Sequence, residues 1–120
     1  MKVAVTSKGG SLSSEIDERF GRARFFVVAD TETGDFEAHE NPAAVNAHGA
    51  GVAAAKFLAD RGVEALISGN VGPKAFMTLN AAGIKIYSAS SMTVAEAIEA
   101  LKQGKLDSVS EPTRPGGHNI

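Results

Sequence analysis

The sequence has no cysteine, no long basic run and no apolar stretch long enough to cross a bilayer. Without cysteine there is no disulfide and no thiolate for a metal, so any metal must be held by histidine, carboxylate or other oxygen donors. A formal net charge of −2 without a basic cluster argues against DNA or RNA as a partner. Because no signal-length or membrane-spanning apolar segment is present, we expect a cytoplasmic protein with no membrane partner.

The signatures of two enzyme classes are also missing. Lys8-Gly9-Gly10-Ser11 follows the first apolar run, but it is neither a dinucleotide-binding fingerprint nor a P-loop. Two-metal nucleases need converging carboxylates, yet the first strand, at 2–6, has none and the fourth ends in Ser68-Gly69-Asn70. We therefore expect neither a nuclease nor a dinucleotide-dependent oxidoreductase.

What the sequence does contain is one domain of α/β pattern. A chain of 120 residues with 43% hydrophobic residues suits a single core. We place the domain at 1–106 and expect a flexible C-terminal tail at 107–120. Apolar runs and alternation predict five strands, at 2–6, 24–30, 35–40, 63–68 and 84–87. Helical spacing predicts three helices, starting at Gly49, Pro73 and Thr93.

Two local details of this pattern can be checked directly. Thr93 and Glu96 fit a capping box at the start of the third helix. On the strand at 35–40, His39 is out of phase with Phe36 and Ala38, which predicts that His39 faces solvent.

The element order predicts a mixed sheet with strand order 3-2-1-4-5, strand 2 antiparallel, as in ribonuclease-H-like folds. The first and fourth strands would then be parallel neighbours. Their carboxyl ends would bring together the loop after residue 6, the segment 46–51 and the loop 69–73. Open α/β sheets bind ligands at such edges.

Two loop-to-helix junctions stand out as candidate binding elements. Ala47-His48-Gly49-Ala50-Gly51 and Gly69-Asn70-Val71-Gly72-Pro73 each place glycines at a helix start. Glycine allows a close backbone approach, and the first N–H groups of a helix lack intrahelical partners and carry partial positive charge. Both junctions therefore favour an anionic ligand.

Several motifs occur in a characteristic order along the chain: Asp17-Glu18-Arg19-Phe20-Gly21-Arg22-Ala23; Asn41-Pro42 with His48-Gly49-Ala50-Gly51; and Gly72-Pro73-Lys74-Ala75-Phe76 with Leu79, Gly83-Ile84 and Tyr87. In this order and spacing they resemble the dinitrogenase iron-molybdenum cofactor biosynthesis family, up to Leu106. The resemblance implies a ribonuclease-H-like domain. It also implies binding and transfer of iron-sulfur or iron-molybdenum cluster precursors between metallocofactor assembly proteins.

Two histidines are candidate metal ligands. His48 adjoins the first junction, where it is either a ligand or a solvated histidine next to the helix cap. His118, in the C-terminal Gly116-Gly117-His118, is either a second ligand on a folded-over tail or part of a free tail.

The remaining candidates would bind an anionic cofactor without coordinating it. Arg19 and Arg22 either donate to an anion or pair with a nearby carboxylate such as Asp17 or Glu15. Gly49, Gly51, Asn70 and Gly72 form the cofactor-binding backbone, although the glycines also suit helix packing. Phe20 is interpreted as a core residue that anchors its loop.

The missing thiolates shape the functional hypothesis, because iron-sulfur clusters are usually anchored by cysteine. We expect non-enzymatic, reversible binding and delivery of a preassembled cluster or its precursor. One alternative is a regulatory domain that binds an anion or nucleotide without metal. Another is a purely structural partner in a larger assembly. The sequence leaves the oligomeric state open.

Overall fold

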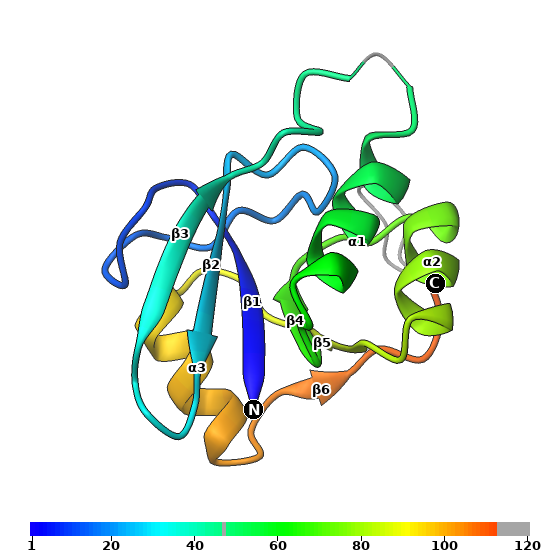
Figure 1. Cartoon of the computed structure of the whole chain (residues 1–120). Coiled ribbons are helices and arrows are strands. Elements are labelled where there is room, and N and C mark those ends of the chain that lie inside the picture. The colour runs from blue at the N-terminus through cyan, green and yellow to red at the C-terminus, as the bar shows by residue number, and fades with distance from the viewer. Residues whose placement is uncertain (47, 113–120) are drawn as a thin grey trace.

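The computed structural model describes residues 1–46 and 48–112. These residues form six strands and three helices (Figure 1). In chain order the elements are β1 (Lys2–Ser7), β2 (Phe25–Asp30), β3 (Phe36–Glu40), α1 (Ala50–Asp60), β4 (Ala65–Ser68), α2 (Pro73–Ala81), β5 (Lys85–Ser88), α3 (Val94–Lys102) and β6 (Asp107–Ser108). The three helices and the first five strands lie where the sequence pattern predicts them, within a few residues at each end.

All six strands belong to one sheet of order β3-β2-β1-β4-β5-β6. β1 is antiparallel to β2 and parallel to β4, and β4 is parallel to β5. The predicted order of the first five strands is therefore confirmed. The prediction of only five strands is wrong, because β6 lies in the segment expected to be a tail. The ribonuclease-H-like assignment stays a prediction.

β6 is too short to be predicted from sequence. It has two exposed residues, Asp107 and Ser108, which pair antiparallel with Ser88 and Tyr87. A further bond of 2.8 Å runs from the Val109 N–H to the Ile86 carbonyl. Two polar residues carry no alternation signal, so this pairing depends on the neighbouring β5 rather than on local propensity.

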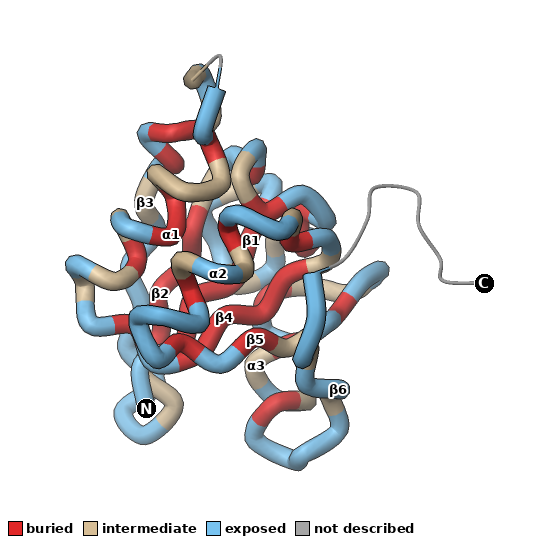
Figure 2. Tube along the Cα trace, turned by 90° about the vertical axis from the view of Figure 1, so that its right-hand side faces the viewer, coloured by how far each residue is buried: buried red, intermediate tan, exposed pale blue. Residues whose placement is uncertain are grey.

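The helices cover both faces of the sheet, α1 and α2 on one face and α3 on the other (Figure 1). Alternation along β1 explains the two layers, since Ala4 joins the α1–α2 core while Val3 and Val5 join the α3 core. The central strands are buried along most of their length (Figure 2). The parallel strands β1 and β4 thus present their carboxyl ends at one edge, where the loops to the helices begin.

The predicted capping box of α3 is confirmed. The Thr93 hydroxyl oxygen accepts from the Glu96 N–H at 3.2 Å, and Glu96 Oε1 accepts from the Thr93 N–H at 2.8 Å. This reciprocal pair satisfies donors that a helix start otherwise leaves unpaired.

The predicted orientation of β3 is wrong. His39 is half-buried, with its ring 5.9 Å from the Phe57 ring of α1 in an edge-on arrangement. Phe36 is instead 41% exposed. β3 is an edge strand, and α1 covers the face that carries His39, so packing against Phe57 overrides the apolar alternation.

Within the described residues, no helix is long and apolar enough to cross a membrane.

Candidate functional site

A hollow of about 480 Å³ opens where α1 and α2 begin, at the carboxyl-terminal edge of the parallel strands. Three segments far apart in sequence form its wall: the loop before β2, the start of α1 and the start of α2. The residues lining it are Phe20, Gly21, Arg22, Gly49, Ala50, Gly51, Val52, Gly72, Pro73, Lys74 and Ala75. The volume falls within the range of roughly 300–1,000 Å³ that is usual for small-ligand sites.

Glycines set the close contacts between these segments. A Cβ on Gly21 would lie 2.8 Å from the Gly51 nitrogen, and a Cβ on Gly51 would lie 2.9 Å from Cβ of Ala75. Each distance is shorter than a real Cβ contact allows, so the backbone can approach this closely only without a side chain. Gly51 therefore has a clear packing role, in addition to lining the hollow.

The loop before β2 is also tied to the loop after β4. The Asn70 N–H donates to the Glu18 carbonyl at 2.6 Å, and the Phe20 N–H donates to the Asn70 carbonyl at 3.2 Å. A Cβ on Gly69 would lie 2.7 Å from the Glu18 oxygen. Asn70 thus acts through its backbone and does not line the hollow. Phe20, 2% exposed and packed on Phe26, anchors the loop as predicted.

Arg19 lies outside the hollow and pairs with Asp17. Its Nε and Nη2 donate to the Asp17 carboxylate at 3.2 and 3.3 Å, and its backbone N–H donates to Asp17 Oδ1 at 3.0 Å. The Asp17 side chain is 5% exposed, whereas that of Arg19 is 66% exposed. Hydrogen bonding and charge attraction from Asp17 raise the pKa of Arg19. Of its two predicted roles, the geometry favours pairing with a carboxylate.

Arg22 lines the hollow and also braces the loop after β3. Its Nη1 donates to the carbonyls of Ala44 at 2.8 Å and Asn46 at 2.6 Å. These bonds use one of the three guanidinium nitrogens. Arg22 is exposed, so its other donors can serve a ligand in the hollow.

Asn41, the first residue after β3, holds the loop before β2. This buried amide donates from Nδ2 to the carbonyls of Gly21 at 3.1 Å and Ala23 at 2.9 Å, and its Oδ1 accepts from the Ala43 N–H at 2.9 Å. Its Asn-Pro motif is visible in the sequence, but the distant carbonyls that it satisfies are not.

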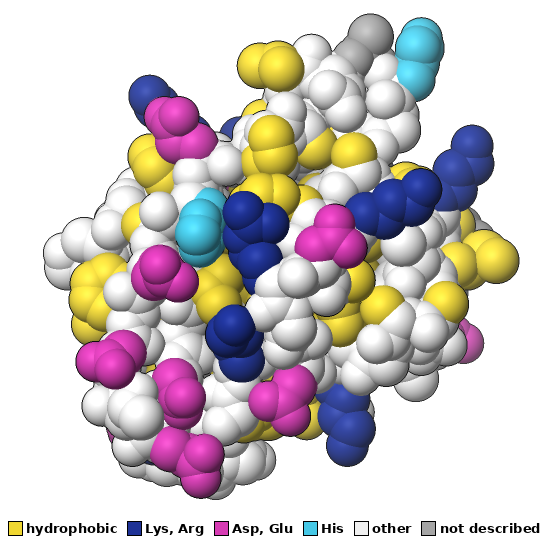
Figure 3. Space-filling model, in the orientation of Figure 1, with side chains coloured by type: hydrophobic (Ala, Val, Ile, Leu, Met, Phe, Trp, Pro, Cys, Tyr) yellow, Lys and Arg dark blue, Asp and Glu magenta, His cyan; other side chains and the backbone are white. Residues whose placement is uncertain are grey.

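The hollow is electropositive. Neither α1 nor α2 receives an N-terminal cap from a described side chain, and neither first turn contains an acidic residue. The lining holds two basic residues, Arg22 and Lys74, and no carboxylate. Figure 3 shows several basic side chains on the α1–α2 side, whereas acidic ones gather around the β2–β3 hairpin. Helix starts and cations together favour an anion.

The predicted site residues divide into three groups. Arg22, Gly49, Gly51 and Gly72 line one hollow, whereas the loop after residue 6, also predicted to converge there, contributes no lining residue. Arg19, Asn70 and His48 do not line it, although the exposed His48 directly precedes Gly49. His118 lies outside the described residues.

The described part of the chain contains no group of three or more histidine or acidic residues placed to hold a metal ion. The donors around the hollow are cationic side chains and helix N–H groups, which suit a preformed anion rather than direct coordination of a bare metal.

Comparison with known proteins agrees with the motif order. A family model described as "Dinitrogenase iron-molybdenum cofactor" matches residues 1–104. The chain belongs to this family. One relative is an uncharacterized protein of Methanocaldococcus jannaschii, which is 34% identical over 110 residues that cover 89% of this chain and 90% of the relative.

Two solved structures of related proteins share the fold closely. The apo form of the orange protein from Desulfovibrio gigas is 40% identical, with a TM-score of 0.92, over 94% of this chain and 96% of its own. A candidate NifB protein from Thermotoga is 45% identical, with a TM-score of 0.84, over 94% of this chain and 97% of its own. The family match over residues 1–104 spans both helix starts that line the hollow.

The sequence pattern predicts the starts of both helices but does not single out Lys74, which lines the hollow. Lys74 follows Pro73 in the first turn of α2, where a cation is disfavoured by the helix dipole. A lysine in the first turn of a helix that has no acidic residue there is the sequence signal that could have identified it.

Proposed function

We propose that the protein binds and delivers an anionic iron-sulfur or iron-molybdenum cluster, or a precursor of one, and that it catalyses no reaction itself. The cargo would occupy the hollow between the starts of α1 and α2. One observation carries this proposal. The starts of α1 and α2, which no described side chain caps, surround a single hollow together with Arg22 and Lys74, and no carboxylate is among its lining residues. Membership of a family named for the iron-molybdenum cofactor supplies the class of anion.

The donor set fits delivery better than permanent storage. Cysteine thiolates usually anchor iron-sulfur clusters, and this chain has none. Charge and hydrogen bonds would hold a preassembled anion while leaving it exchangeable, because none of them is a metal–sulfur bond to the protein. A metallocofactor assembly protein that offers thiolates could then remove the cargo.

His48 is proposed as a ligand at the rim of the hollow. It is exposed and adjoins Gly49, whose φ of 71° turns the chain into α1. An imidazole nitrogen is a common ligand for iron. His118 is retained as a second proposed ligand on sequence grounds alone.

Anaerobic titration with a synthetic thiolate-capped iron-sulfur cluster tests the proposal. We expect iron to elute with the protein in gel filtration, with altered cluster absorption and an altered electron paramagnetic resonance signal after reduction. Arg22→Ala and Lys74→Ala should lower the bound iron, whereas Lys56→Ala, an exposed α1 position away from the lining, should not. Absence of protein-bound iron would refute the proposal.

A metal-free anion or nucleotide site is the second candidate, favoured by the absence of a metal-binding cluster within residues 1–46 and 48–112. Calorimetry with inorganic phosphate and with ATP, in buffer freed of metals, separates the two. This candidate predicts heat of binding that His48→Ala leaves intact and that Lys74→Ala reduces. No heat from either compound contradicts it.

A further inference from the structure

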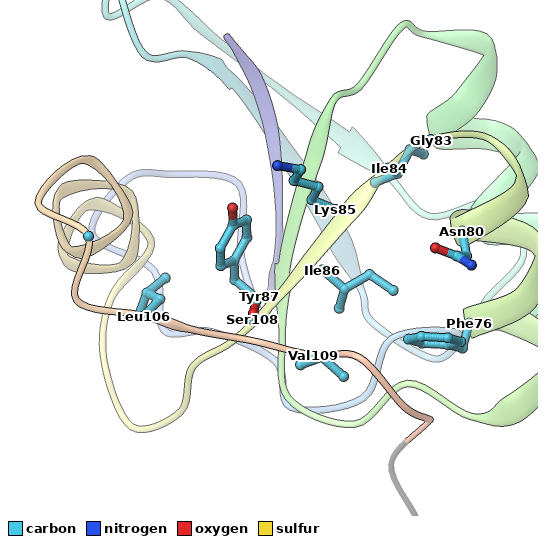
Figure 4. A pocket seen from close by; sticks show the side chains of 11 residues that line it. Phe76, Asn80, Gly83, Ile84, Lys85, Ile86, Tyr87, Leu106, Ser108 and Val109 are labelled. Atoms are coloured by element: carbon cyan, nitrogen blue, oxygen red, sulfur yellow. The ribbon is translucent and has the colours of Figure 1, made fainter.

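A second hollow, of about 590 Å³, lies along β5, the strand next to the short edge strand β6. Five consecutive residues, Gly83 to Tyr87, line it. Successive side chains of a strand point to opposite faces. Consecutive residues can therefore line one hollow only if it follows the edge of the strand, and Figure 4 shows Lys85 and Tyr87 on one side of β5 and Ile86 on the other.

β6 covers only part of this edge. It pairs with Tyr87 and Ser88, and the Ile86 carbonyl accepts from the Val109 N–H at 2.8 Å. The Lys85 N–H donates to the Glu64 carbonyl at 3.0 Å, so the main-chain groups of Lys85 face β4. The main-chain groups of Ile84 and Ile86 consequently face away from β4. The Ile84 N–H donates to the Leu79 carbonyl at 3.0 Å, and the Ile86 carbonyl is taken by Val109. The Ile84 carbonyl and the Ile86 N–H are therefore the groups that an added strand would pair with.

The two faces of the hollow differ in chemistry. On the α2 face, Ile86, Phe76 and Val109 form an apolar slot (Figure 4). On the other face, Lys85 is exposed, and it is the one charged residue among the lining residues that the structure describes. A strand placed alongside β5 would meet an apolar slot on one side and a cation on the other.

We propose that the β5 edge binds an extended segment of a partner protein as an added strand, with alternating apolar and acidic side chains. An apolar side chain would enter the slot between Phe76 and Val109, and the next residue, acidic, would face Lys85. Main-chain hydrogen bonds would supply affinity, and the two faces would supply specificity. The proposal does not depend on what occupies the hollow between α1 and α2.

A partner protein is favoured over a second copy of this chain. Of the two edge strands that the structure describes, β3 carries two acidic residues, Glu37 and Glu40, and lies at the opposite end of the sheet, while β6 carries Asp107. Pairing β3 of one copy with β5 of the next would be a head-to-tail contact, which extends into filaments unless the rotation closes a ring. A segment of a separate protein with complementary charge can pair with the β5 edge without forming filaments.

The test uses a fluorescent peptide of alternating valine and glutamate. We expect its anisotropy to rise with a dissociation constant below about 1 mM and the amide signals of Ile84 to Tyr87 to shift in NMR spectra. Two control peptides should bind at least about tenfold more weakly. One has the valines and glutamates in separate blocks, and the other carries N-methyl groups on alternate backbone amides.

Charge exchange makes the test specific to this edge. Lys85→Glu should weaken the valine–glutamate peptide about tenfold and strengthen a valine–lysine peptide by a similar factor. Lys56→Glu, the same change at an exposed position of α1, should do neither. Equal binding of the N-methylated peptide, shifts confined to other residues or no binding at about 1 mM would overturn the proposal. Concentration-dependent oligomers that Lys85→Glu abolishes would assign the edge to a second copy and also overturn it.

Discussion

Gly21 lies directly against the first turn of α1, so close that a Cβ on Gly21 would stand 2.8 Å from the Gly51 nitrogen. This contact joins the Arg22 loop to the helix start that lines the hollow. The atoms in the way are backbone atoms, which cannot rotate aside as a flexible side chain would.

Gly21→Ala should therefore destabilise the protein, by about 1–3 kcal/mol as for other overpacked sites. Gly72→Ala is the matched control, because a Cβ there meets nothing within 4 Å and its φ of −71° suits any residue. Urea denaturation measures both variants. Equal stability of the two would show that the Gly21 contact relaxes without cost.

Gly72→Leu should reduce cargo binding while the fold persists. Gly72 lines the hollow and needs neither a positive φ nor a close contact, so its missing side chain mainly keeps the space open. A leucine there would occupy that space. We expect less protein-bound iron after titration with the thiolate-capped cluster, and an unchanged circular dichroism spectrum. Undiminished iron binding would place the cargo elsewhere.

The fold was predictable where local signals were complete. The capping box of Thr93 and Glu96 needs only four neighbouring residues, and it is present as predicted. β6 and the phase of β3 were not predictable, because both depend on neighbours distant in sequence. β6 exists through its pairing with β5, and His39 turns inward to contact Phe57.

In the candidate site, the positions of the glycines were easier to predict than the partners of the long side chains. Gly49 and Gly72 mark helix starts, and topology brings those starts together. The partner of a long side chain depends on geometry that local sequence does not encode. Arg19 and Arg22 look equivalent in sequence, yet one pairs with Asp17 and the other braces distant carbonyls beside the hollow.

Stability should fall in acid partly through Asp30. Hydrogen bonds from the backbone N–H groups of Glu32, the largest cause, and of Thr33, with attraction from the N-terminal amine and Lys2, lower the pKa of Asp30 in the folded chain. A carboxyl with a lowered folded pKa contributes stability above its unfolded pKa of about 3.9 and loses it as the pH falls through the folded value.

Asp30→Asn should accordingly reduce the drop in stability between neutral pH and about pH 3. Urea denaturation of wild type and variant at both pH values measures the difference. Asp35→Asn is the control in the same turn, since it is the Asp35 backbone carbonyl that accepts from the Asp30 N–H. An identical acid dependence in wild type and Asp30→Asn would contradict the assignment.

Alanine substitutions of the two cations of the hollow should differ in their effect on stability. Arg22→Ala removes bonds of 2.8 and 2.6 Å that hold the carbonyls of Ala44 and Asn46, so it should cost about 1 kcal/mol and lower the melting temperature. Lys74→Ala removes a cation from the first turn of α2, where the helix dipole opposes it, so the melting temperature should hold or rise.

Both variants should bind less of the anionic cluster, and both should show a weaker dependence of binding on salt. Thermal denaturation without ligand and iron binding at low and high salt, measured on the same preparations, test this pairing. If Lys74→Ala lowered the melting temperature as much as Arg22→Ala does, Lys74 would serve the fold. If it also left iron binding unchanged, the positive charge of the hollow would come from Arg22 and the helix starts alone.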